Sequence, residues 1–227
     1  MNNLIELSNI SKTFYSDKNV KVLKKISFFF KKGKIYSLMG PSGSGKSTLL
    51  NLISLIDMPS SGYIKIDNQK IEAKDKKKND LLRANKIGIV YQQDNLLNDF
   101  TALENIYLAG LAAGLKKEIA VSKAKKLLKS VNLSNRIDHY PSELSGGEKQ
   151  RVSIVRAIIN EPQIILADEP TGSLDKKNSI EIFNLLKKQI NSNRIIIFAT
   201  HNRFFANKSD CLLEIVDGNI KTINGWV

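Results

Sequence analysis

A glycine-rich segment, GPSGSGKST, occupies residues 40–48 and combines residue types that bind phosphate groups. It matches the pattern G-x-x-x-x-G-K-[ST] in full. Glycines let successive backbone N–H groups converge on phosphate oxygens, Lys46 can bridge β- and γ-phosphates, and the Ser47 hydroxyl can ligate Mg²⁺. The sequence therefore predicts a nucleotide site formed by Gly40, Pro41, Ser42, Gly43, Ser44, Gly45, Lys46, Ser47 and Thr48.

A pair of carboxylates follows the apolar run IILA at residues 164–167. At the end of a buried strand, Asp168 would hold Mg²⁺ through water. Glu169 could accept a proton from the water that attacks the γ-phosphate, or orient that water. The alternative is a solvated turn, but the glycine-rich segment in the same chain favours a shared site for nucleotide hydrolysis.

Two further polar residues, Gln92 and His201, each follow an apolar run. Gln92 could ligate Mg²⁺, sense the attacking water, or simply end its strand. His201 could contact the γ-phosphate or be an ordinary polar residue at a strand end. Both are expected at the carboxyl ends of parallel strands, where ligands collect in open α/β sheets.

A second glycine-rich stretch, SELSGGEKQR, lies at residues 142–151. Its two glycines follow a serine and lead into a helix-favouring sequence. The N-terminus of a helix attracts anions because its backbone N–H groups point outward and its dipole is positive there. Ser145, Gly146 and Gly147 are therefore predicted to form a second phosphate-binding half-site.

The elements that must position these residues alternate along the chain. Residues 34–39 are predicted to form a short apolar strand and residues 87–91 a buried β-branched strand, and the continuous apolar runs at 164–167 and 195–199 are typical of parallel strands covered on both faces. Their alternation with helical patterns predicts an α/β sheet with crossover connections. Between these strands we expect a helical subdomain over residues 95–160, with a capping box of Thr101 and Glu104 at a helix start.

Composition limits the partners and the compartment. The chain has 227 residues and a net charge of +13, which fits nucleic acid or anionic membrane. Only six of its 35 basic residues are arginine, the residue preferred for bidentate readout, so we favour a lysine-rich surface and no nucleic-acid partner. No apolar run reaches the roughly 20 residues of a membrane span. We expect no signal peptide, and the single Cys211 fits a reducing cytosol.

Taken in order, GPSGSGKST, YQQ, LSGGEKQR, ILADEPTGSLD and ATH make the chain resemble an ATP-binding cassette (ABC) ATPase along essentially its whole length. The resemblance implies one domain over residues 1–227, with a P-loop NTPase (RecA-like) core, a mostly parallel sheet, an antiparallel β edge and the inserted helical subdomain. It implies ATP and Mg²⁺ as cofactors. It also implies that two cassettes, in a homodimer, meet head to tail. Ser145, Gly146 and Gly147 would then bind the nucleotide held by the partner.

The same resemblance assigns the remaining site residues. Phe14, with Tyr15 beside it, would stack on adenine, although Phe14 could instead be a core aromatic. Asp175 lies in a loop that links the two sites, and Gln92 would act as a lever toward the helical subdomain. Asn202 stands where the family usually has aspartate, which puts a supporting hydrogen bond in doubt. The implied catalytic residues are Lys46, Glu169 and His201, and the implied Mg²⁺ ligands are Ser47, Gln92 and Asp168.

Within the family, NLLNDFTALENI and the segment around LSGGEKQR resemble the subgroup that serves lipoprotein-releasing and macrolide-exporter permeases. This implies an ATPase at the cytoplasmic face of the inner membrane that drives separate permease subunits, most closely for lipoprotein release. Residues 96–115 would dock the permease, though part of this stretch could be plain core. Alternatives are a macrolide- or peptide-exporter cassette, a cell-division cassette and, more distantly, a soluble nucleic-acid- or ribosome-associated ATPase.

Overall fold

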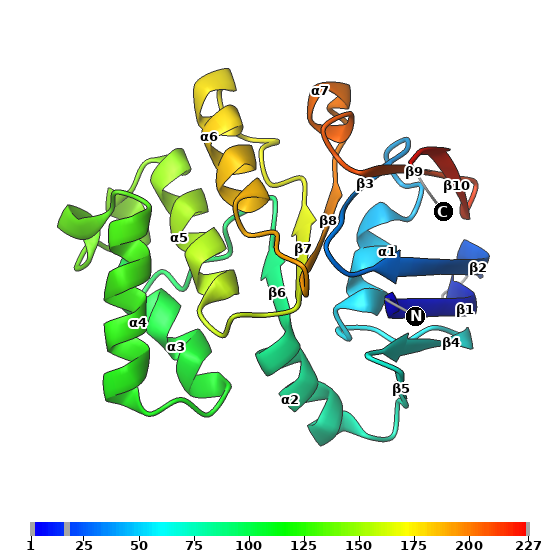
Figure 1. Ribbon diagram of the computed structural model, residues 1–227, viewed down its shortest axis with the longest axis horizontal. Helices are drawn as coiled ribbons and strands as arrows, with labels where there is room; N and C mark the ends of the chain where they lie inside the picture. Colours follow the sequence, from blue (N-terminus) through cyan, green and yellow to red (C-terminus); the bar gives the residue numbers. More distant parts are fainter. Residues whose placement is uncertain (1–2, 16–18, 226–227) are drawn as a thin grey trace. The chain divides into compact units, whose positions relative to one another are not determined.

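The computed structural model describes residues 3–15 and 19–225, which are shown as a ribbon in Figure 1. The chain forms two compact units. The first comprises Met1–Asp80 and Ile190–Val227, and the second comprises Leu81–Gln189. Parallel and antiparallel strands occur together with helices, which confirms the predicted α/β class. The boundaries of the helical subdomain at residues 95–160 remain a prediction.

The first unit contains an antiparallel sheet with the strand order β2-β1-β4-β5. Its strands are β1 (Asn3–Phe14), β2 (Val20–Lys31), β4 (Ser61–Ile66) and β5 (Gln69–Lys70). Phe28 and Phe30 of β2 pack edge to face with Tyr36, with ring centroids 4.9 to 6.1 Å apart. Burial in this aromatic cluster raises the pKa of Tyr36 to about 12, because the charged phenolate is poorly solvated there.

Four more strands of the first unit run in the order β10-β9-β3-β8. They are β3 (Ile35–Met39), β8 (Ile195–Ala199), β9 (Cys211–Val216) and β10 (Asn219–Asn224). β3 is parallel to both β8 and β9, and β10 is antiparallel to β9. All of β8 and nearly all of β3 is buried, which explains the continuous apolar sequence of β8 and the mostly apolar sequence of β3. β3 leads into α1 (Lys46–Ile53), and β8 leads toward α7 (Arg203–Ala206).

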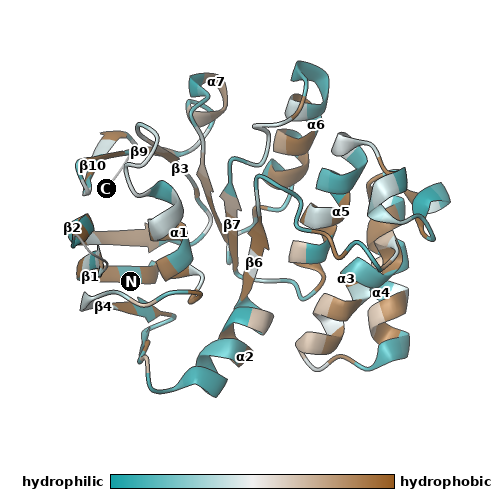
Figure 2. Ribbon diagram, turned by 180° about the vertical axis from the view of Figure 1, so that it is seen from behind, coloured by the Kyte–Doolittle hydropathy of each residue, from teal (hydrophilic) through white to brown (hydrophobic). Residues whose placement is uncertain are grey.

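The second unit is built on two parallel strands, β6 (Ile87–Val90) and β7 (Ile164–Asp168), which Figure 2 shows in brown as hydrophobic. Its helices are the second half of α2 (Lys76–Lys86) and all of α3 (Ala102–Ala112), α4 (Lys117–Ser130), α5 (Gly146–Ile158) and α6 (Lys176–Lys187). Short 3-10 turns span Ser134–Arg136 and Pro141–Glu143. Among residues 3–15 and 19–225, no helix is both long and apolar enough to cross a membrane.

Two glycines allow close packing in the second unit. A Cβ added to Gly110 of α3 would lie 3.1 Å from the Cβ of Ala120 in α4. A Cβ added to Gly88 of β6 would lie only 2.2 Å from the carbonyl oxygen of Ala157 in α5. The backbone of α5 therefore rests directly on β6, where no side chain fits.

The predicted capping box at the start of α3 is confirmed. Thr101 Oγ1 accepts a hydrogen bond from Glu104 N at 3.3 Å, and the Glu104 carboxylate accepts one from Thr101 N at 2.8 Å. Asn105 is 2% exposed and fixes the preceding loop. Its Oδ1 accepts from Leu97 N at 2.7 Å, and its Nδ2 donates to the carbonyl oxygens of Leu97 and Phe100. One buried amide thus sets the shape of the chain that enters α3.

We expect Gly88→Ala to destabilise the chain by about 1–3 kcal/mol, because the new methyl group would force α5 away from β6. Urea unfolding followed by circular dichroism would measure the loss. Gly114→Ala is the matched control, since, its chain neighbours apart, no atom of residues 3–15 and 19–225 lies within 4 Å of its added methyl group. That control should lose only about 1 kcal/mol for its left-handed backbone. A smaller loss for Gly88→Ala than for the control would contradict the close contact.

Candidate functional site

The phosphate loop, residues 40–48, packs closely against neighbouring strands at two glycines that leave no room for a side chain. Gly40 has φ 145°, and a Cβ there would lie 2.3 Å from the carbonyl oxygen of Ile215 in β9. Gly45 has φ 105°, and a Cβ there would lie 2.7 Å from Cδ2 of Leu23 in β2. Both backbone conformations lie in the region that favours glycine. The loop is therefore held between β9 and β2 by contacts that only these residues permit.

The same loop offers donors that fit a polyphosphate. Gly45 is the N-cap of α1, and no side chain caps the helix, so its first N–H groups can bind an anion. Ser44 Oγ is buried and has no hydrogen-bond partner among the described residues. Lys46 Nζ lies over the loop and donates to the carbonyl oxygens of Gly40 and Pro41, both at 2.9 Å. The loop and the start of α1 thus supply an ammonium group, a hydroxyl and uncapped backbone amides within one short turn.

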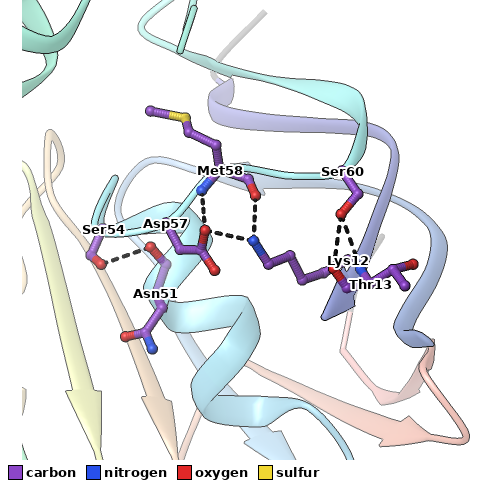
Figure 3. A network of polar contacts seen from close by, with 7 residues as sticks. All are labelled: Lys12, Thr13, Asn51, Ser54, Asp57, Met58 and Ser60. Carbon is purple, nitrogen blue, oxygen red and sulfur yellow. Dashed lines mark hydrogen bonds and ion pairs between the residues drawn. The ribbon is translucent and has the colours of Figure 1, made fainter. Parts of the chain in front are cut away.

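The aromatic predicted to contact the base lies at the end of β1. Phe14 is 45% exposed, so it is not part of the core, and its neighbour Tyr15 is 75% exposed. Lys12 Nζ lies 5.2 Å from the centroid of the Phe14 ring. As Figure 3 shows, Lys12 is held by Asp57 Oδ1 at 2.6 Å and by the carbonyl oxygen of Met58 at 2.9 Å. The loop after α1 therefore fixes the cation beside the exposed ring.

His201 and the phosphate loop follow adjacent parallel strands of the first unit. Leu38 of β3 is paired with Ala199 of β8, and Thr200 N donates to the Leu38 carbonyl oxygen at 3.0 Å. Gly40 and His201 therefore follow the carboxyl ends of two adjacent parallel strands, at the same edge of the sheet. Asn202, the departure from the family pattern, caps α7, since its Oδ1 accepts a hydrogen bond from Phe204 N at 2.9 Å. Its side chain thus has a local structural partner.

In the second unit, Gln92 and the carboxylate pair lie at one strand edge. β6 pairs with β7 up to Val90 and Ala167, so Gln92 and Asp168 follow paired positions. A Cβ at Gly172 would meet Gln92 Nε2 at 3.3 Å and Glu169 Cβ at 3.6 Å. Gln92 and Glu169 therefore border the same glycine. Glu169 has φ 46°, a left-handed conformation that is uncommon for a residue with a side chain.

The signature segment, Ser145–Gly147, begins α5. Ser145 and Gly146 are exposed, and Gly147 is buried. Ser145 is the N-cap, and its Oγ accepts from Glu148 N at 3.4 Å. The Glu148 carboxylate accepts from Ser145 N at 2.8 Å, and it also pairs with Arg136 Nε at 3.0 Å. These hydrogen bonds lower the pKa of Glu148, with the backbone N–H of Ser145 as the largest cause.

The capping role of Glu148 was missed in the sequence, although S-x-x-E at residues 145–148 is the spacing of a capping box. It gives the signature segment a different character from the phosphate loop. Some of the amide groups at the start of α5 already have an acceptor within the chain, whereas no side chain caps α1. Any phosphate that reaches α5 therefore meets a helix start that is already partly neutralised.

The segment after β6 is tied to α5 by two residues that the sequence did not reveal. Gln150 Nε2 donates to the Tyr91 carbonyl oxygen at 3.2 Å. Arg156 Nη2 and Nη1 donate to the carbonyl oxygens of Asp94 at 2.8 Å and Asn95 at 2.7 Å. Burial lowers the pKa of Arg156, and the nearby carboxylate of Asp94 opposes that shift by favouring the charged guanidinium. Gln92 therefore lies between Tyr91 and Asp94, whose backbone carbonyl groups are hydrogen-bonded to α5.

The loop after Glu169 ends where α6 begins. Asp175 is the N-cap of α6 and accepts from Asn178 N at 3.0 Å. Hydrogen bonds from Asn178 are the main cause of a lowered pKa for Asp175, which is exposed. The loop is also tied back by Ser179 Oγ, which donates to the carbonyl oxygens of Thr171 at 3.3 Å and Leu174 at 3.2 Å.

The donor set is suited to a hard cation rather than to a metal held by the protein alone. No cluster of three or more His, Cys, Asp or Glu residues that could hold a metal occurs within residues 3–15 and 19–225. The predicted ligands Ser47, Gln92 and Asp168 carry hydroxyl, amide and carboxylate oxygens, which are the ligands that Mg²⁺ prefers when waters and phosphates complete its shell. Each unit thus gathers its own group of predicted residues. The groups are Phe14, the phosphate loop and His201 in the first unit, and Gln92, Ser145–Gly147, Asp168, Glu169 and Asp175 in the second.

Comparisons with known proteins point in one direction. Residues 23–172 match the family described as ABC transporter. The lipoprotein-releasing system ATP-binding protein LolD of Rickettsia felis is 43% identical over 219 residues, covering 96% of this chain and 97% of that protein. LolD of Ehrlichia ruminantium (strain Gardel) is 44% identical over 229 residues, with full coverage of both chains. The dimeric post-hydrolysis structure of the ATP-binding cassette MJ0796 bound to ADP and Pi matches with a TM-score of 0.89 at 37% identity, covering 98% of this chain and all of that one.

We expect Lys46→Ala to weaken ATP binding by the isolated chain roughly 10- to 100-fold, because a hydrogen bond to a charged group contributes about 1.5–3 kcal/mol. Titration calorimetry would measure the dissociation constant. Ser145→Ala is the comparison variant and should bind ATP as the parent does, since it removes only a helix cap of α5. Equal losses of ATP affinity in the two variants would contradict a phosphate loop that binds nucleotide by itself.

Proposed function

This chain belongs to the ABC transporter family, and we propose that it is the ATP-hydrolysing subunit of a lipoprotein-releasing transporter. The observation that carries the proposal is the identity of 43–44% along the chain to proteins named for that system. The geometry supports it through two separate glycine-dependent helix starts, at α1 and at α5, of which only α1 lacks a side-chain cap. A single nucleotide site would need only one of them.

ATP would be bound mainly by the first unit. The uncapped N–H groups of α1 and the Ser44 hydroxyl would donate to phosphate oxygens, and Lys46 would exchange its two carbonyl partners for the β- and γ-phosphates. The exposed ring of Phe14 would stack on adenine, with the Lys12 ammonium adding a cation beside the ring. Mg²⁺, held by Ser47, Gln92 and Asp168, would neutralise phosphate charge.

Hydrolysis would depend on Glu169. A carboxylate can accept a proton from the attacking water, and the left-handed backbone of Glu169 fixes the direction of its side chain just after β7 ends. His201 would contact the γ-phosphate. Gln92, which borders the same glycine as Glu169, would report the state of the nucleotide to the segment that Gln150 and Arg156 fix to α5.

Two copies of the chain would share two nucleotides. The exposed Ser145 and Gly146, with Gly147 behind them, would bind the γ-phosphate that a partner cassette holds. The solved cassette MJ0796 has been described as a dimer, including a state bound to ADP and Pi. ATP would favour the closed pair because it contacts both copies, and hydrolysis would remove that preference.

The membrane partner would be a separate permease, and this subunit would then lie at the cytoplasmic face of the inner membrane. The docking segment, residues 96–115, presents Leu97 at 49% exposure and Phe100 at 38%, whereas Leu96 and Ile106 are buried. The buried Asn105 side chain hydrogen-bonds to the backbone N–H of Leu97 and to the backbone carbonyl of Phe100. The backbone that carries these two exposed side chains is therefore fixed. A permease of the macrolide-exporter type is the second candidate, favoured by the sequence YQQDN at residues 91–95.

We expect Glu169→Gln to reduce ATP turnover at least 100-fold while ATP binding is retained, because an amide cannot accept the proton. With ATP and Mg²⁺ the variant should accumulate as a dimer, which size-exclusion chromatography would detect. The matched control is Glu161→Gln, a change of an exposed glutamate beyond α5. Near-normal turnover in Glu169→Gln, or a species that stays monomeric, would exclude Glu169 as the base.

We expect Leu97→Glu to abolish stimulation of the ATPase by the permease and co-purification with it, because a charge is costly in an apolar contact. Basal ATP hydrolysis by the isolated subunit should persist, since Leu97 is exposed. Leu81→Glu is the control, a leucine 53% exposed on α2. Full permease association in Leu97→Glu would place the docking surface elsewhere.

A further inference from the structure

The signature segment lies against the start of α6. A Cβ at Gly147 would lie 2.6 Å from Oδ1 and 3.0 Å from Cγ of Asn178. A Cβ at Gly146 would lie 3.6 Å from Cδ2 of Leu174. The two glycines therefore border the residues on either side of Asp175, and the backbone at Gly147 approaches the Asn178 side chain more closely than any other residue would allow.

Asn178 uses the two ends of its side chain in different directions. Its Oδ1 faces Gly147, while its Nδ2 donates to Asp175 Oδ2. Its backbone N–H donates to the other carboxylate oxygen of Asp175 at 3.0 Å. The Asp175 carboxylate is thereby fixed in orientation and kept ionised, since both bonds favour its charged form.

The loop that carries Asp175 has little freedom relative to α6, because Ser179 Oγ donates to the carbonyl oxygens of Thr171 and Leu174. The first turn of α6 and residues 171–175 thus form one piece. A second link joins the helices further along, where Arg151 Nη1 lies 3.6 Å from Glu181 Oε2, but half of the Glu181 side chain is solvent-exposed. At the start of α5, Asn178 makes the closer contact between this piece and the signature segment, and Leu174 makes the looser one.

We propose that Asn178 is a positioning residue that makes the signature segment and the Asp175 loop one rigid edge for the partner cassette. The proposal rests on the proposed function, because it concerns closure of two copies of this chain. Both elements would face the partner, and fixing their relative position in advance removes an ordering cost when the pair closes. Asn178 itself would contact neither the nucleotide nor the water molecule that attacks it.

The test uses the Glu169→Gln chain, in which ATP-driven dimers should accumulate. Asn178→Ala keeps the backbone N–H that caps α6, and alanine is a better helix former than asparagine, so the thermal midpoint should be unchanged or higher. ATP binding by the monomer should also be unchanged. We expect the dimer dissociation constant, measured by analytical ultracentrifugation with ATP, to rise roughly tenfold, because the variant loses the Asn178 hydrogen bond to Asp175 together with the contact at Gly147. If Asn178 only stabilised the fold, the variant would lower the thermal midpoint of unfolding and leave the dimer dissociation constant unchanged.

Two further variants separate contact from hydrogen bonding. Asn178→Asp keeps the shape toward Gly147 but loses the donor and places a second carboxylate beside Asp175, so it should weaken the dimer at least as much. Lys177→Ala, an exposed neighbour, is the control and should dimerise as the parent does.

The steric half is tested by rescue. Gly147→Ala should abolish the dimer, because its methyl group would overlap Oδ1 of Asn178. Adding Asn178→Ala leaves only a Cβ at 3.6 Å, an ordinary contact, and should restore the dimer to the level of Asn178→Ala alone. The inference is overturned if Asn178→Ala dimerises like the parent or if the double variant is no better than Gly147→Ala. If Glu169→Gln itself fails to dimerise with ATP, the proposed function fails instead.

Discussion

Close contact at glycine is the constraint on which both units depend. The phosphate loop rests on β9 at Gly40 and on β2 at Gly45, and α5 rests on β6 at Gly88. At each of these positions an added Cβ would lie between 2.2 and 2.7 Å from another atom. Helix starts that bind phosphate must present N–H groups in a fixed direction, and at Gly40 and Gly88 the neighbour is a backbone carbonyl, which cannot rotate away as a side chain can. The glycines therefore set where α1 begins and how α5 lies on its strand.

The two helix starts are equipped differently, and this difference gives the cassette its polarity. α1 has no side-chain cap, and Ser44 keeps a buried hydroxyl without a partner among the described residues. α5 is capped by Ser145 and Glu148, whose carboxylate is held ionised by the Ser145 N–H and by Arg136. An anion would bind α1 readily, whereas at α5 it must compete with a resident carboxylate. Such an arrangement suits a helix that contributes to a nucleotide already bound elsewhere.

Much of the fold followed from sequence because its signals are local. Continuous apolar runs gave the parallel strands, and T-x-x-E gave the start of α3. The same spacing at Ser145 was overlooked because its glycines suggested phosphate alone. Exposure of Phe14 could not be read from sequence, since an aromatic at a strand end suits core or surface. Gln150 and Arg156 escaped notice because their partners are carbonyl groups about 60 positions earlier in the chain, which carry no side-chain signature.

At Glu169, folding stability and ATP turnover favour different residues, because the backbone is left-handed there. A φ of 46° is strained for any residue with a Cβ and comfortable for glycine. A screen that rewards only resistance to heat should therefore favour removal of this side chain, and the survivors would be firmly folded but without the proposed base. Selection under a requirement for ATP turnover should keep the glutamate and accumulate its stabilising changes elsewhere. The two screens, run in parallel libraries, should therefore select different residues at position 169.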